Sequence, residues 1–409
     1  MSLLFALALL AIPAWASPAP ADTTDDAPGI EIRPRVAPSA LYSTNRGFGI
    51  GGGVGISNAG WTGSELTLDL RLQQRFQAVN ATLFTGDPYD ARVHGLVALG
   101  GSTTNRRRYY GLGPYTLTDN ELNLFHDAAE AEVRLGAYPL GSTALLLQPG
   151  VRYLYDKSGG VNEDASQGSL EALDPLSVRA VRVAEGEARH ALSVGMEVAT
   201  DLRDWPSYPR SGSFFSLAAR RQFALDDNAL TLDRYAGTAI GYLPIQGRTA
   251  IVLRAVGVLT RSSDLDGDGE GDDIPFYYLP TLDDRVAAPF RQERLTGRDI
   301  VAAGAGIRFP VVDFIGVYGI DALVIGYLGN AYDNVFDQFT LDVSFREQST
   351  AGPDGEAPLR PALGVGMGVV NLDKERVVVG GLVGFGPGGV TLATLRIAYD
   401  LRDARPLFR

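Results

Sequence analysis

The sequence contains no cysteine and only three histidines among its 409 residues. Without cysteine, the chain can form no disulfide, no thiolate nucleophile and no cysteine-based zinc site. The histidines stand singly at positions 94, 126 and 190, with no motif spacing to a nucleophile, so we expect neither a multi-histidine metal centre nor an enzyme. A formal charge of -12 excludes broad nucleic-acid binding, because the average surface would repel a polyanion.

The N-terminus carries an export signal. Residues 3–16, LLFALALLAIPAWA, are uninterruptedly apolar and end in small residues suited to signal peptidase, although no lysine or arginine precedes them. A membrane-anchoring helix needs a longer run, of about 20 residues. We therefore predict a signal peptide at 1–16 and a flexible periplasmic leader, rich in Pro, Ala and Asp, at 17–38.

From residue 39 to 409, the chain repeats a period-two pattern. In ELTLDLRL, leucine occupies every second position from Leu66 to Leu72, with polar residues between, and QFTLDVSFRE does the same from Phe339 to Phe345. Glycine is abundant, at 49 residues, which favours tight turns over helices. Sixteen such segments begin near Phe48, Glu65, Ala78, Val93, Ala128, Ala144, His190, Ser213, Ala229, Thr249, Ile300, Ile320, Phe339, Ala362, Val377 and Val390.

An even number of strands with one apolar face each predicts an all-β fold, a transmembrane antiparallel β-barrel of about 16 strands. A soluble β-sandwich or propeller is the alternative, because isolated period-two strands look alike in either setting. Residues 314–332 are apolar enough for a membrane helix, but Asp321 and four glycines weaken that interpretation. We predict a turn followed by a strand there.

Two stretches resemble the bacterial surface antigen family, to which BamA and TamA belong. RRRYYGLGPYT is similar to the end of an early family strand, matched by Arg108, Tyr110, Gly111 and Gly113. DLRDWPSYPRSG is similar to a family turn motif, matched by Asp201, Arg203, Asp204, Pro209 and Gly212. The resemblance implies a sixteen-stranded outer-membrane barrel. Because only about two dozen residues separate the predicted cleavage site from the first strand, too few for a folded domain, we expect a member without periplasmic repeats.

The resemblance also implies a long loop that folds into the lumen, where family members pair the arginine of an Arg-Gly-aromatic motif with an aspartate. Here Phe290 matches the aromatic residue, whereas Ala288 and Pro289 replace Arg and Gly, and Tyr327 stands in the place of the aspartate. We hypothesise that the loop is held instead by Arg291, Arg294 or Arg298, against lumenal acids.

DLDGDGEGDD resembles the first half of a calcium loop, with Asp264, Asp266, Asp268 and Asp272 as possible ligands. Pro275 stands where a bidentate glutamate is needed, so a solvated acidic loop is the alternative. Calcium is the one cofactor that the sequence suggests.

Taken from the resemblance, the expected function is membrane insertion, translocation or assembly of proteins in the bacterial outer membrane. The expected partners are outer-membrane lipids and outer-membrane proteins as clients, and the sequence does not fix an oligomeric state. A passive pore or structural barrel is the runner-up, and a binding module built on the acidic loop comes third. We interpret DLRDWPSYPRSG as a tight turn with charged strand ends rather than a catalytic cluster.

Overall fold

A computed structural model gives the fold of the chain. It describes residues 35–43, 46–57, 64–85, 93–138, 145–204, 208–226, 230–262, 274–282, 287, 289–290, 293–314, 316–345, 356–373, 376–387 and 389–397. Among these residues, no helix is long and apolar enough to cross a membrane. The predicted calcium ligands and residues 17–34 of the predicted leader lie outside the described residues. The predicted start of the barrel at 39 is wrong, because the first strand begins at Arg35.

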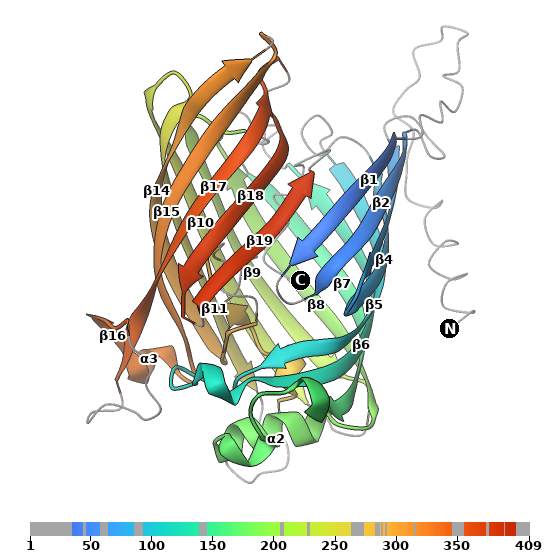
Figure 1. Cartoon of the computed structure of the whole chain (residues 1–409). Helices are drawn as coiled ribbons and strands as arrows, with labels where there is room; N and C mark the ends of the chain where they lie inside the picture. The colour runs from blue at the N-terminus through green and yellow to red at the C-terminus, as the bar shows by residue number, and fades with distance from the viewer. Residues whose placement is uncertain are drawn as a thin grey trace, which may run out of the picture.

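Sixteen antiparallel strands form a single barrel wall (Figure 1). They are β1 Arg35–Ser43, β2 Gly47–Ser57, β3 Ser64–Gln73, β4 Phe76–Thr85, β5 Val93–Tyr109, β6 Leu122–Ala137, β7 Leu146–Val161, β8 Ala188–Asp201, β9 Gly212–Ala224, β10 Thr231–Gln246, β11 Thr249–Ser262, β14 Asp299–Phe314, β15 Tyr318–Tyr332, β17 Ala357–Asn371, β18 Arg376–Gly386 and β19 Gly389–Ile397. The predicted all-β barrel of about 16 strands is confirmed, and the strand prediction for 318–332 is correct.

Each strand pairs with the next one along the wall. In the described residues, fifteen antiparallel ladders run from β1–β2 to β18–β19, and none of them joins β19 back to β1. The two end strands nevertheless come within 8 Å between Cα atoms. Among the strands that the structure describes, the series of ladders is therefore interrupted between β1 and β19, and we call this position the seam.

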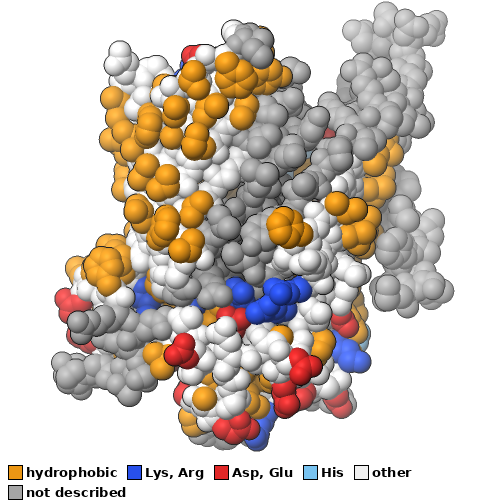
Figure 2. All heavy atoms as spheres, viewed as in Figure 1, with side chains coloured by type: hydrophobic (Ala, Val, Ile, Leu, Met, Phe, Trp, Pro, Cys, Tyr) orange, Lys and Arg blue, Asp and Glu red, His pale blue; other side chains and the backbone are white. Residues whose placement is uncertain are grey.

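The period-two pattern sorts side chains to the two faces of the wall. On β3 the leucines at 68, 70 and 72 are exposed on the outside, and on β6 Val133 and Leu135 are exposed while Glu132 and Arg134 are buried toward the lumen. Figure 2 shows hydrophobic side chains over the outer wall, with charged side chains gathered at one end of the molecule. An apolar outside and a charged inside are typical of barrels that sit in lipid.

The predicted set of wall strands differs from the observed set at two places, and the two differences cancel in the total of sixteen. β1 was missed, because RVAPSALYS contains a proline and small residues that blur the alternation. β16, Phe339–Val343, follows the period-two pattern but lies outside the ring, where it pairs in parallel with the start of β17. A period-two segment reports an exposed and a covered face, not membership of the wall.

The long connections lie at one end of the barrel, here called the loop end. The connection between β7 and β8 carries two short 3₁₀ turns and helix α2, Pro175–Ala184, which packs on the 3₁₀ turn Phe276–Tyr278 and on the ends of β5 and β6. Asp174 caps α2 by accepting a hydrogen bond from the Ser177 amide, and Pro175 occupies the first turn. The connection between β15 and β17 carries α3, Val335–Gln338, and β16.

Candidate functional site

A short hairpin folds from the loop end into the barrel. Strands β12, Thr281–Leu282, and β13, Leu295–Thr296, pair with each other in the long connection between β11 and β14. Leu282, Phe290 and Leu295 are fully buried in one apolar cluster with lumen-facing residues of β9, β10, β11, β14, β15 and β17. The hairpin therefore packs against the inner wall and fills part of the lumen.

The tip of the hairpin touches the far part of the wall. A Cβ atom added at Gly364 on β17 would lie 2.9 Å from Cγ of Pro289, and one added at Gly384 on β18 would lie 2.8 Å from the Pro289 Cα. Distances below 3.0 Å are sterically forbidden, so both positions need glycine for the tip to sit where it does. Gly364 and Gly384 thus leave the space on the inner wall in which Pro289 packs.

Arg294 fastens the hairpin at its base. The side chain is fully buried and donates two hydrogen bonds to Thr116, from Nη1 to Oγ1 at 2.6 Å and from Nη2 to the carbonyl oxygen at 2.9 Å. Its guanidinium also lies 4.8 Å from the ring centroid of Tyr110. Arg294 therefore joins the hairpin to the connection between β5 and β6, which contains the stretch that resembles the family's early strand motif.

That connection, residues 110–121, crosses the mouth of the barrel. Gly113 donates its amide to the Thr296 carbonyl at 2.8 Å, and Leu112 forms a parallel bridge with Thr296. Farther across, the Tyr115 hydroxyl donates to the Glu356 carbonyl at 2.9 Å, and Arg360 of β17 donates to the carbonyl of Pro114. We call residues 110–121 the mouth segment.

Arg108 and Tyr110 are held by one buried acid. Glu121 accepts a hydrogen bond from the Tyr110 hydroxyl at 2.7 Å and lies 3.1 Å from Nε of Arg108. Glu293, on the hairpin, accepts a hydrogen bond from the Arg108 amide at 2.9 Å. Gly111 and Gly113 have positive φ values, of 102° and 74°, which other residues adopt only with strain. The structure thus brings two predicted stretches together, although they lie about 180 residues apart.

Of the other two arginines of the hypothesis, the structure describes Arg298. Arg298 is partly buried and interacts electrostatically with Asp333 beyond β15. Arg291 lies outside the described residues. The sequence predicted lumenal acids as partners of these arginines, and the structure adds the hydroxyl and carbonyl of Thr116 as partners of Arg294. Thr116 is the last residue of RRRYYGLGPYT, and its polar side chain is the one signal in the sequence that could have indicated this contact.

The turn motif lies between β8 and β9, at the end of the barrel opposite the loop end. Asp201 accepts three hydrogen bonds from Arg203, from its amide, Nε and Nη2 at 3.2, 2.7 and 2.5 Å. Asp204 Oδ1 accepts from the amides of Arg210 and Ser211 at 2.9 and 3.2 Å. Gly212, with φ 96°, starts β9, where a Cβ would lie 2.9 Å from Cα of Arg203. These contacts fold the segment tightly on itself.

Tyr208 shows that the segment is more than a turn between strands. It is buried and donates its hydroxyl to Asp321 on β15, and the guanidinium of Arg308 on β14 lies 4.0 Å from its ring centroid. Arg308 also donates to the carbonyl of Pro209. Since β10 and β11 lie between β9 and β14 in the wall, the segment connects strands that are not neighbours.

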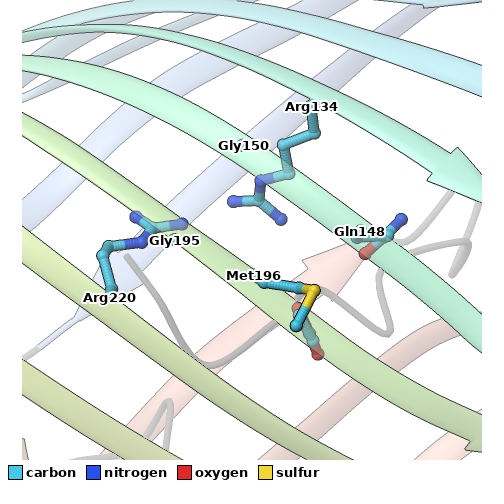
Figure 3. Close-up of a pocket in the computed structure, with 7 residues that line it drawn as sticks. Arg134, Gln148, Gly150, Gly195, Met196 and Arg220 are labelled. Carbon is cyan, nitrogen blue, oxygen red and sulfur yellow. The ribbon is translucent and has the colours of Figure 1, made fainter.

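A charged cleft lies on the inner wall (Figure 3). Arg134 on β6 and Arg220 on β9 point toward one another, and Glu132 accepts hydrogen bonds from both, at 2.7 and 3.1 Å. Gly150 and Gly195 lie between the two arginines in the wall. A Cβ atom added at Gly150 would lie 3.0 Å from Cγ of Arg134, and one added at Gly195 would lie 3.0 Å from Cβ of Arg220. Glu132 offsets part of the arginine charge and connects β6 with β9 across the two strands between them.

Comparison with known structures identifies the fold. No protein-family model matches the sequence, and no curated protein is significantly similar to it. The structure is similar to that of BamA from Haemophilus ducreyi lacking POTRA domains 1–3, with a TM-score of 0.59 and 13% identity over 89% of this chain and 70% of that one. It is also similar to CdiB from Escherichia coli, with a TM-score of 0.54 and 9% identity over 88% of this chain and 62% of that one. The chain has a BamA-like barrel fold.

Within this BamA-like barrel, Tyr327, which stands in the place of the motif's aspartate, and Phe290, which matches its aromatic residue, lie in the same apolar cluster. Tyr327 and Phe290 are both buried there, and a Cβ on Gly304 of β14 would lie 2.6 Å from the Tyr327 ring. At the position where the resemblance implies an aspartate, Tyr327 is therefore packed in an apolar cluster. Replacing a buried ion pair by packed hydrophobic residues can stabilise a protein, because no charge has to be desolvated.

The histidines of the BamA-like barrel sit on three different strands, β5, β6 and β8. His94 contacts Gln148 at 3.2 Å, His190 contacts the Tyr153 hydroxyl at 2.6 Å, and His126 contacts Asp156 at 3.1 Å. Each contact lies between neighbouring strands or one strand away. The four aspartates of the calcium hypothesis lie in 263–273, outside the described residues, so that hypothesis stays a prediction.

Proposed function

We propose that the chain resides in the bacterial outer membrane and acts there on other proteins, in their insertion, translocation or assembly. In this proposal the chain is not an enzyme, and its partners are outer-membrane lipids and outer-membrane proteins as clients. The observation that carries the proposal is the seam between β1 and β19 in a BamA-like barrel.

The seam offers backbone groups to another strand. β1 and β19 have nine residues each, whereas β5 has seventeen. Strand edges without a ladder present unpaired N–H and C=O groups, which are templates for pairing with another chain. A client strand added at this seam would satisfy those groups without opening a ladder elsewhere in the wall.

The elements that occupy part of the lumen favour this function over a passive pore. The hairpin packs on the inner wall, the mouth segment crosses the loop end, and Tyr208 contacts β15 at the opposite end. A pore selected for steady diffusion needs a continuous aqueous path, and these three elements narrow it. A barrel with a partly filled lumen, and with no ladder between β1 and β19 in its described residues, is better suited to act at its lateral side.

Site-specific photo-cross-linking in outer membranes tests the proposal. A photoreactive amino acid at Ala40 or Leu41, adjacent positions of β1, presents the group on either face of the strand. The matched control is Leu217, exposed on the outer face of β9 and away from the seam. We expect adducts with other outer-membrane proteins from β1 and none from Leu217.

Planar-bilayer conductance distinguishes the runner-up. A steady open current from the purified chain, together with no protein adduct from Ala40 or Leu41, would show a passive pore or structural barrel and overturn the proposal. Protein adducts from the seam together with a small or flickering current would support it.

A further inference from the structure

The connection after β15 leaves the barrel sideways. Residues 333–345, here called the wing, comprise α3 and β16 and project away from the wall at the loop end (Figure 1). β16 pairs with β17 at Phe339 with Ala357 and at Val343 with Leu359, and the next amide, that of Ser344, donates to the Leu359 carbonyl at 3.0 Å. The wing therefore has one attached edge and is otherwise uncovered by the described parts of the chain.

The wing exposes a large apolar surface. Phe336, Leu341 and Phe345 are 76%, 79% and 87% exposed, and Phe339 and Val343 are also exposed. These values exceed those of exposed apolar residues on the wall, for example Leu328 at 38% and Leu217 at 70%. Exposed apolar side chains are ordinary when they occur singly, but five within ten residues form a patch that water solvates poorly.

The base of the wing is firmly built. Tyr332, Val335 and Ala357 form a small buried cluster, and the rings of Tyr332 and Phe339 lie 6.2 Å apart. The Val335 amide donates to Asp299 at 3.0 Å, and the Asn334 side chain accepts from the Phe336 amide at 3.2 Å. Because its backbone is held in this way, the wing presents its apolar side chains in a fixed direction.

The wing is amphipathic. Thr340 and Asp342 alternate with the apolar residues along β16, and therefore lie on its other face. In Figure 2, hydrophobic side chains gather on the side of the wing nearer the apolar wall, and acidic side chains lie on its far side. An element with one apolar and one acidic face is suited to a boundary between hydrocarbon and water.

The position of the wing selects lipid as the occupant. Its apolar face continues the outer wall, because Phe339 of the wing packs on Tyr332, the last residue of β15, and exposed residues such as Leu328 and Leu363 follow on β15 and β17. A soluble protein could cover this face only by entering between the wing and the hydrocarbon beside the wall. The few ladder bonds of β16 also require nearby water or headgroups for its free backbone groups, so the wing must lie shallow.

We propose that the wing is a lateral membrane anchor, whose apolar face lies in the interfacial layer of the lipid leaflet at the loop end. The inference rests on the membrane location in the proposed function. It adds a contact with lipid outside the barrel wall, on the side of β15 and β17, away from the seam.

Single-cysteine labelling in phosphatidylcholine vesicles tests the anchor, and the absence of native cysteine keeps the labelling specific. A fluorescent label is placed by Leu341→Cys on the apolar face, by Asp342→Cys on the acidic face, and by Leu217→Cys on the barrel wall. Glu171→Cys, in the solvent-exposed connection between β7 and β8, is the aqueous control. The quencher is a nitroxide carried on the acyl chain, either near the headgroup or near the chain end.

We expect the Leu341 label to be quenched by the shallow nitroxide at least about half as strongly as the Leu217 label, and the Asp342 and Glu171 labels to be several-fold less quenched. The deep nitroxide should quench Leu217 labels but not Leu341 labels. If Leu217 is quenched while Leu341 is as accessible to water as Glu171, the anchor is refuted and the membrane location stands. If Leu217 is not quenched either, the membrane location fails, and the anchor with it.

Discussion

Replacing Arg294 by alanine should release the hairpin from the mouth of the barrel. The arginine is fully buried, donates two hydrogen bonds to Thr116 and lies over the ring of Tyr110. A hydrogen bond to a charged group contributes about 1.5–3 kcal/mol, and a desolvated cation–π contact roughly 2 kcal/mol. Because such contributions overlap, we take about 4 kcal/mol as the loss.

That loss applies to local opening rather than to unfolding of the whole barrel. At about 1.4 kcal/mol for each factor of ten, the open population of the hairpin should rise by roughly a thousandfold. Amide hydrogen exchange, followed by mass spectrometry on the barrel in detergent, measures this population directly. Peptides covering 293–296 should exchange faster in the variant, while peptides from β9 to β11 should keep the wild-type rate.

The control is Arg221→Ala. Arg221 lies on the outer face of β9 and pairs with Asp233, its Nε 2.6 Å from Oδ1, but the side chain is more than half exposed. Solvent screens an exposed pair of this kind, and the pair does not touch the hairpin, so hairpin exchange should not change. The reasoning is refuted if exchange of 293–296 in Arg294→Ala stays within about threefold of wild type, since the contacts would then carry too little free energy to hold the hairpin.

Three further perturbations follow from other contacts in the structure. Gly384→Ala should clash with the proline at the hairpin tip and increase bilayer conductance, whereas Gly101→Ala, whose Cβ would have 3.9 Å to its nearest neighbour, should not. Tyr208→Ala should remove the contact with Asp321 and speed proteolysis of the segment between β8 and β9, and Tyr208→Phe should do so less. Burial raises the pKa of Asp333, so between the usual aspartate pKa and the raised one the folded state keeps a proton that the unfolded state releases. The protection of the loop around Asp333 against hydrogen exchange should therefore fall as pH rises through this interval. In Asp333→Asn the protection should not change with pH over the same interval.

The barrel itself could be predicted from the sequence because its signal is local. Alternation in ELTLDLRL reports which side of a strand meets lipid, and the structure places those leucines outside. The same local rule misplaced β16, whose alternating face is the exposed face of the wing, and missed β1, whose alternation is weak. Local patterns say that a face is apolar but not what covers it.

The site could be predicted only in part, because its contacts are between distant residues. The sequence pointed to Arg294 and Tyr110 separately, each from its own stretch, but not to their contact or to Thr116. Tyr208 was hidden inside a segment that had the composition of a turn. Neither propensity nor spacing reports pairings across a lumen, since these depend on the register of every strand between them.

The mouth segment also has a consequence for the order of assembly. Its contacts join residues that lie 178 positions apart, from Thr116 to Arg294, and 246 apart, from Pro114 to Arg360. Contacts of such long sequence separation form late, because the chain between them must first lose its conformational freedom. The mouth can therefore be fastened only after β17 has joined the wall, so a barrel arrested at any earlier strand would remain open at its loop end.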